Sequence, residues 1–262
     1  MVTIEYEQSL IETTVFLAVR NDERLECELH QVVDRLYEIP DEERRQREFA
    51  PVFREFFTKL GLDRLIVGLL AERPLIGERV DRCVVRDAPR KKAQSAELLV
   101  QDNEHDDEHL RRTLVIQICP QSFLDAGGTT ALSSPRGRFV TLMRRELLHV
   151  ADMLDKRFGY IRETFSGEPS WQNLQRDWYR VLWDTYVAGR LEREQLGVNG
   201  EKERLERAFG RVFANGIADI DGGVFAGIFD APSLTHRNFM DWAREPVLLL
   251  IRSPDRLKSP QP

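Results

Sequence analysis

Three β-rich runs lie between two stretches of helical periodicity, and this layout constrains the fold more than any other feature of the chain. The runs cover residues 79–85, 96–101 and 113–119. The third, Thr-Leu-Val-Ile-Gln-Ile-Cys, is rich in β-branched residues and is followed by Pro120, so we expect a central strand there. A small sheet with helices before and after it in sequence is typical of the α+β class.

Apolar residues recur at helical spacing on both sides of these runs. The predicted helices before the sheet cover residues 21–37, 41–59 and 63–73. The predicted helices after it cover residues 135–156, 170–195, 201–215 and 235–244. We expect Ser134 with Pro135, Ser170 and Thr235 to begin three of them, because such residues favour helix N-termini. The glycine-rich stretch 216–227 is predicted to form a loop or short strands.

The length of 262 residues allows one large domain or two small ones. We expect an N-terminal helical segment, residues 1–75, and an α+β domain, residues 76–262. The segment either packs as part of the same domain or extends it.

The composition is typical of a soluble protein of the cytoplasm. Lys and Arg total 38 against 44 Asp and Glu, a net charge of −6, which disfavours non-specific nucleic-acid binding. The three cysteines are an odd number without metal-site spacing. Met1–Gln8 has no signal-peptide pattern, and no apolar run approaches the ~18 residues of a membrane span. We therefore expect no nucleic-acid and no membrane partner.

The predicted helix over residues 135–156 carries a polar stripe on an otherwise apolar surface. Arg145, His149, Asp152 and Lys156 follow one another at spacings of four, three and four, which places them on one face. Glu146 lies at the edge of the stripe, about 60° from His149. In one interpretation the stripe faces a specific partner or a water-filled cleft. In the other it faces bulk solvent, and Asp152 pairs with Lys156.

The segment Arg145-Glu146-Leu147-Leu148-His149 resembles the active-site motif of the zincin metalloproteases, H-E-x-x-H. In that motif two histidines bind zinc and the glutamate is the general base. The resemblance implies that Glu146 is the catalytic base and His149 a metal ligand. Arg145 stands at the position of the first histidine.

The similarity continues over roughly residues 95–195. Val150-Ala151-Asp152-Met153-Leu154-Asp155, followed by Phe158-Gly159-Tyr160, is similar to a bacterial group of uncharacterised zincin-like proteins with the pattern H-E-L-x-H-x-x-D-M-L-D. The resemblance implies a zincin-like α+β fold, with a small mixed β-sheet, an active-site helix and a second long helix.

The resemblance leaves the third zinc ligand open. In one zincin arrangement an acidic residue on the next long helix closes the site, which implies Asp184, with Glu192 as the second choice. Asp155 lies ten residues after Arg145, the third-ligand spacing of another arrangement. However, Asp152 stands where that arrangement has a glycine, so Asp155 ranks below Asp184.

Arginine cannot replace the missing histidine, because it is permanently cationic and has only hydrogen-bond donors. In one alternative, no metal binds and Arg145 occupies the place of the cation, paired with Asp184 or another carboxylate. In the other, a rewired site binds zinc through His149, an acid such as Asp184 and a ligand from elsewhere, such as His236. Asp152 is better placed to contact a ligand than to bind the same ion directly.

These alternatives correspond to two functions. In the first, the chain is a non-catalytic metalloprotease homologue whose cleft binds a peptide or protein. In the second, it is a divergent metallopeptidase in which Glu146 activates a metal-bound water. The loss of one of three protein ligands removes most zinc affinity, which favours the first. His105 and His109 belong to an acidic turn, which we interpret as a solvated charge cluster rather than a metal site.

Overall fold

A computed structural model of the chain describes residues 2–20, 22–101, 111–124, 137–214 and 222–251. The chain divides into two compact units, residues 1–150 (unit 1) and residues 151–262 (unit 2). Each unit has its own core, and the helix α6 begins in the first and ends in the second. No helix within the described ranges is long and apolar enough to cross a membrane.

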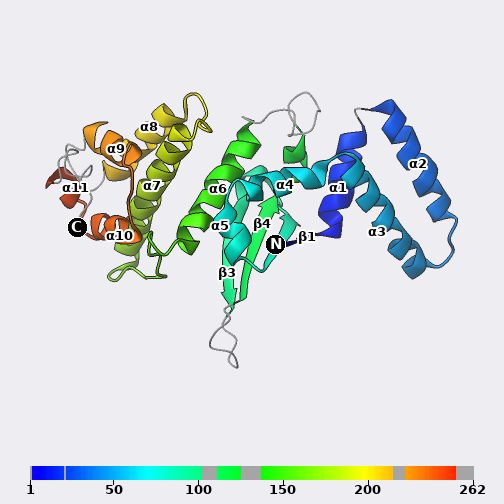
Figure 1. The fold of residues 1–262 in the computed structure, drawn as a ribbon, viewed down its shortest axis with the longest axis horizontal. Helices are drawn as coiled ribbons and strands as arrows, with labels where there is room; N and C mark the ends of the chain where they lie inside the picture. Colours follow the sequence, from blue (N-terminus) through cyan, green and yellow to red (C-terminus); the bar gives the residue numbers. More distant parts are fainter. Residues whose placement is uncertain (1, 21, 102–110, 125–136, 215–221, 252–262) are drawn as a thin grey trace. The chain divides into compact units, whose positions relative to one another are not determined.

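Unit 1 combines a mixed sheet with helices, which confirms the predicted α+β class (Figure 1). Its strands are β1 (Thr3–Tyr6), β2 (Arg82–Asp87), β3 (Ser95–Gln101) and β4 (Arg111–Ile118). Its helices are α1 (Gln8–Val19), α2 (Glu23–Tyr37), α3 (Glu42–Lys59), α4 (Leu62–Ala71), α5 (Pro74–Arg79) and most of α6 (Arg138–Leu154).

The strand order in the sheet is β1-β2-β4-β3. β1, β2 and β4 are parallel, and β3 runs antiparallel to β4 at the edge. The predicted central strand is confirmed, since β4 lies between β2 and β3. Alternate residues of β2 and β4 form one buried apolar face: Cys83, Val85, Leu114, Ile116 and Ile118. The opposite face is mostly polar. On this face Glu5 of β1 lies beside Val84 of β2.

Aromatic contacts hold the N-terminal helices against the buried face. The Tyr6 ring lies 5.1 Å from that of Phe57 on α3, which in turn lies 6.0 Å from Phe123. The Tyr6 hydroxyl donates a hydrogen bond to the Asp63 carbonyl on α4 at 3.1 Å. Residues before position 75 therefore contribute a strand and a core to the same unit as the rest of the sheet. The two compact units meet at 150/151 in sequence.

Unit 2 is helical in its described part, and α8, α9 and α10 pack against α7 (Figure 1). Its helices after α6 are α7 (Pro169–Arg193), α8 (Glu201–Phe213), α9 (Gly222–Phe229), α10 (His236–Arg244) and α11 (Leu248–Ile251). Its largest fully buried side chains are aromatic: Trp178, Phe209, Phe213, Phe225, Phe239 and Trp242. These rings supply most of the apolar area that holds the helices together.

The helix termini agree with the predicted capping residues in some places and not in others. The Asp41 side chain accepts a hydrogen bond from the Arg44 amide at 2.6 Å and begins α3. Thr235 caps α10 in a reciprocal arrangement with Asn238, as predicted from Thr235. Ser170 is not a cap, because α7 already begins at Pro169, which suits the first helical position.

The glycine-rich stretch differs from its prediction in the part that the structure describes. Residues 222–229 form the helix α9 rather than a loop or short strands. Phe225, Ile228 and Phe229 are buried, and this burial outweighs the weak helix propensity of the glycines. Residues 215–221, and the expected cap at Ser134 and Pro135, lie outside the described residues.

Candidate functional site

Helix α6 carries the residues that the zincin resemblance singles out. Its buried apolar side chains are Val140, Met143, Leu147, Leu148, Val150 and Leu154. Arg145, Glu146 and His149 are half-buried, so they lie at the border between this apolar face and the polar side of the helix. The helical spacing therefore presents the three motif residues together, as the sequence predicts.

Arg145 and Glu146 form an ion pair. Nη2 of Arg145 donates to Oε1 of Glu146 at 3.2 Å, and each side chain is 22% exposed. The guanidinium thus lies at the position that the resemblance gives to a zinc ligand, and it contacts the carboxylate that the resemblance makes the base. One oxygen of Glu146 is consequently engaged by a fixed cation.

The neighbouring Arg144 joins α6 to the end of α4. Its Nε and Nη2 donate to the two carboxylate oxygens of Glu72 at 2.8 and 2.7 Å. Arg144 is only 8% exposed, so this is a nearly buried, bidentate pair. It fixes this turn of α6 to the end of α4. We did not predict this role, although an arginine one turn from Val140 and Leu148 was a signal for a buried charge.

Asp152 is buried at the C-terminal turn of α6, in unit 2. Its carboxylate accepts a hydrogen bond from Nε1 of Trp183 at 2.9 Å and pairs with Arg190, both on α7. The interpretation of the stripe as a solvent face with an Asp152–Lys156 pair is therefore wrong for Asp152, which is 4% exposed. A buried carboxylate needs such partners because its desolvation is costly.

Asp184 lies on a different face of α7. Trp183 and Arg190 are seven residues apart and share a face, whereas Asp184 is turned by about 100° from Trp183. Arg204 on α8 lies close to Asp184. A hydrogen bond from Arg204 to Glu201 and the nearby carboxylates of Glu201 and Asp184 raise the pKa of the Arg204 guanidinium against the opposing effect of burial. Asp184 therefore faces α8, and Asp152 does not share its environment.

The alternative ligands Asp155, Glu192 and His236 have different surroundings within unit 2. Asp155 follows α6, and its carboxylate accepts the backbone N–H of Arg157 at 2.8 Å. Glu192 is exposed near the end of α7. His236 begins α10, is 4% exposed, and shares a hydrogen bond with the Tyr179 hydroxyl at Nδ1, 2.9 Å away. Among the described residues, none of these three side chains belongs to a group of three potential metal ligands.

The residues that the structure describes do not fit a catalytic zinc ion. In the part of the chain that the structure describes, no three histidine, cysteine, aspartate or glutamate side chains gather as a metal site. A catalytic zinc needs three protein ligands with an open fourth position. We therefore derive no catalytic step through a metal. His105 and His109 lie outside the described residues.

Comparisons of the chain with models of protein families, with curated proteins and with solved structures gave no match. The resemblance to the zincins rests on the residues around α6 and on the α+β arrangement that precedes it.

Proposed function

We propose that this protein is a non-catalytic, zincin-like protein that binds an extended peptide or a segment of a partner protein. The contact between Arg145 and Glu146 carries the first half of this proposal. A permanent cation at the position of a zinc ligand repels a metal ion, and it engages the carboxylate that would activate water. Both changes act against metal-dependent peptide hydrolysis.

The edge strand β3 carries the second half. Its one pairing among the described residues is with β4, so its other edge has backbone N–H and C=O groups available to a further strand. Leu99 and Val100 on this strand are 47% and 50% exposed. Extended peptides bind such edges by adding a strand, with main-chain hydrogen bonds for affinity and side-chain contacts for selectivity. An exposed apolar edge is otherwise an aggregation hazard, which a bound partner removes.

Metal content tests the loss of catalysis. We would equilibrate the full-length protein with zinc, remove loosely bound metal by dialysis and measure zinc per chain by mass spectrometry. We expect substoichiometric zinc in the wild type and a measurably higher zinc content in Arg145→His, which restores two of the three protein ligands one helical turn apart. Arg157→His, an exposed arginine just after α6, is the matched control for an added histidine.

Two results would overturn this half of the proposal. Stoichiometric zinc in the wild type, accompanied by cleavage of a casein substrate that stops in Glu146→Gln, would show an active peptidase. A zinc content of folded Arg145→His no higher than that of the wild type and of Arg157→His would show that α6 is not a zincin helix.

Peptide binding is tested separately. Peptides selected from a displayed random library against the full-length protein would be labelled, and their affinities measured by fluorescence anisotropy. We expect the double substitution Leu99→Lys and Val100→Lys to weaken binding at least about tenfold, because lysines on an edge strand oppose strand addition. Ile161→Lys, at a 62% exposed apolar residue of unit 2, is the control. Equal losses in both variants, or no loss in either, would exclude β3 as the binding edge.

A further inference from the structure

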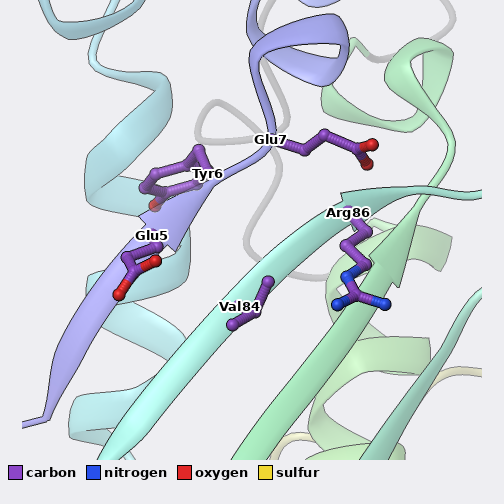
Figure 2. Close-up of a pocket in the computed structure, with 5 residues that line it drawn as sticks. All are labelled: Glu5, Tyr6, Glu7, Val84 and Arg86. Atoms are coloured by element: carbon purple, nitrogen blue, oxygen red, sulfur yellow. The ribbon is translucent and has the colours of Figure 1, made fainter.

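A pocket of about 340 Å³ lies at the carboxyl ends of β1 and β2, on the polar face of the sheet. Figure 2 shows the residues that line it: Glu5, Tyr6, Glu7, Val84 and Arg86. Its volume is at the lower end of the range typical of small-molecule sites. Its position is also one at which parallel sheets bind ligands, since the strand ends leave a crevice there.

The charged residues around the pocket differ in how many contacts they make. Glu5 is held by Arg82 in a two-pronged ion pair. Glu7 accepts the backbone N–H of Asp87 at one oxygen, Oε2, at 3.1 Å. Arg86 has no ion-pair partner among the described residues, although two glutamates line the same pocket. Within the described ranges, the pocket therefore has one guanidinium without an ion-pair partner and one carboxylate oxygen that can still accept a hydrogen bond.

These two groups come from neighbouring parallel strands. Glu5 lies opposite Val84 in the parallel pairing, and the Glu7 amide donates to the Val85 carbonyl, so Glu7 follows β1 beside Arg86. Neighbouring strands lie about 4.8 Å apart. In Figure 2 the Glu7 carboxylate lies by the end of β2, and the Arg86 guanidinium extends the other way, back to the level of Val84. The pocket thus has a carboxylate toward the end of β2 and a guanidinium at the level of Val84.

We infer that this pocket binds a free α-amino acid with an apolar side chain. The guanidinium of Arg86 binds the carboxylate through two parallel hydrogen bonds, and Glu7 accepts from the ammonium group. The side chain of the ligand covers half-buried Val84. A simple anion would leave Glu7 unpaired beside it, and a simple cation would be repelled by Arg86. Only a zwitterion matches both charges. This inference is independent of the zincin proposal and of the β3 edge.

Ligand-observed NMR and titration calorimetry on the full-length protein test the inference with three isosteric probes. L-Leucine carries both charges, 4-methylpentanoate lacks the ammonium group, and 3-methylbutylamine lacks the carboxylate. We expect leucine to bind at least about tenfold more tightly than either analogue, because each loses one charge-assisted hydrogen-bonded contact. Equal binding of leucine and 4-methylpentanoate would reduce the pocket to a carboxylate site and overturn the inference.

Substitutions of the lining residues test whether leucine binds in this pocket. Arg86→Gln and Glu7→Gln each remove one charge, and Glu7→Gln keeps an oxygen for the Asp87 amide. We expect each to weaken leucine binding at least about tenfold. Arg111→Gln and Glu97→Gln, exposed residues of β4 and β3, are matched controls that should bind as the wild type. No leucine binding by folded wild-type protein at millimolar concentrations would show that Glu7 and Arg86 simply neutralise each other. Binding that survives both pocket variants would place leucine elsewhere. Either result overturns the inference.

Discussion

The carboxylate of Asp152 accepts a hydrogen bond from Nε1 of Trp183 at 2.9 Å and, in the same buried position, pairs with Arg190. One side chain thereby joins the end of α6 to two residues of α7 that lie two turns apart on one face. The buried carboxylate depends on both partners, because a charge removed from water is stable only when its partners replace the lost hydration. The residue that we expected to support a metal ligand instead contributes to the core of unit 2.

Replacement of Asp152 should therefore destabilise unit 2. We expect Asp152→Asn to lower the free energy of unfolding by about 2 kcal/mol, since Arg190 loses its partner but remains partly solvated. Asp152→Ala should cost more, because the Trp183 N–H then also lacks an acceptor. Urea unfolding followed by tryptophan fluorescence measures both. Asp177→Asn, exposed on α7, should change stability by less than about 0.5 kcal/mol. Equal effects at positions 152 and 177 would contradict the prediction.

Gly189 marks a close approach between α7 and α9. A Cβ at this position would lie 1.8 Å from the backbone carbonyl oxygen of Phe229. Arg193 hydrogen bonds the same carbonyl at 2.6 Å and that of Ala231 at 2.8 Å, so the end of α9 is held in place. We expect Gly189→Ala to destabilise the protein by about 2 kcal/mol or more, because the backbone of α7 or that at Phe229 must move to make room for the methyl group.

Gly210 on α8 is the matched control for Gly189. A Cβ there meets nothing within 4 Å. Gly210→Ala should therefore stabilise the protein by about 0.5–1 kcal/mol through helix propensity alone. Thermal unfolding of the two variants should show melting temperatures on opposite sides of the wild type. A Gly189→Ala variant as stable as the wild type would refute the packing of α7 against α9.

The Arg144–Glu72 pair should contribute to the stability of unit 1. We expect Glu72→Ala to lower the free energy of unfolding by about 2 kcal/mol, because Arg144 stays nearly buried without its bidentate acceptor. The partial exposure of Glu72 keeps the loss below that of a fully buried pair. Glu78→Ala, exposed on α5, provides the comparison in the same chemical denaturation experiment. A loss no greater than that of the control would mean that α6 does not depend on Arg144.

His236 should make stability depend on pH. Burial lowers the pKa of its imidazole; nearby Glu163 favours the protonated form and Arg244 opposes it. In the unfolded chain histidine takes up its proton near pH 6.5, whereas in the folded protein it resists protonation. The contribution of neutral His236 is therefore complete above about pH 6.5 and declines as the pH falls below that value.

The stability difference between the wild type and His236→Phe isolates this effect. We expect the difference, measured by urea unfolding, to move against the wild type as the pH is lowered from about 7.5 to about 5.5. The substitution also removes the hydrogen bond with Tyr179, which shifts the difference at every pH without adding a slope. A pH-independent difference would show that His236 titrates equally in the folded and unfolded states.

Local patterns were sufficient to predict several elements. Asp41 and Thr235 begin helices because their side chains accept nearby backbone N–H groups, an interaction within one turn. The β-branched run that forms β4 could be identified for the same reason, since strand propensity is expressed over a few residues. The spacing of Arg145, Glu146 and His149 likewise follows from helix geometry alone. Whether this segment belongs to a zincin fold stays a prediction.

Contacts between residues far apart in sequence decided the other elements and the ion pairs. β1 is four residues long and becomes a strand because β2 is there to pair with it. α9 is helical because its aromatic residues are buried, despite its glycines. The sequence alone determined that Arg145 is a permanent cation beside Glu146. The tertiary structure decided that Asp152 pairs with Arg190 and Arg144 with Glu72. Ion-pair partners far apart in sequence depend on how apolar faces pack, and helical spacing carries no information about that packing.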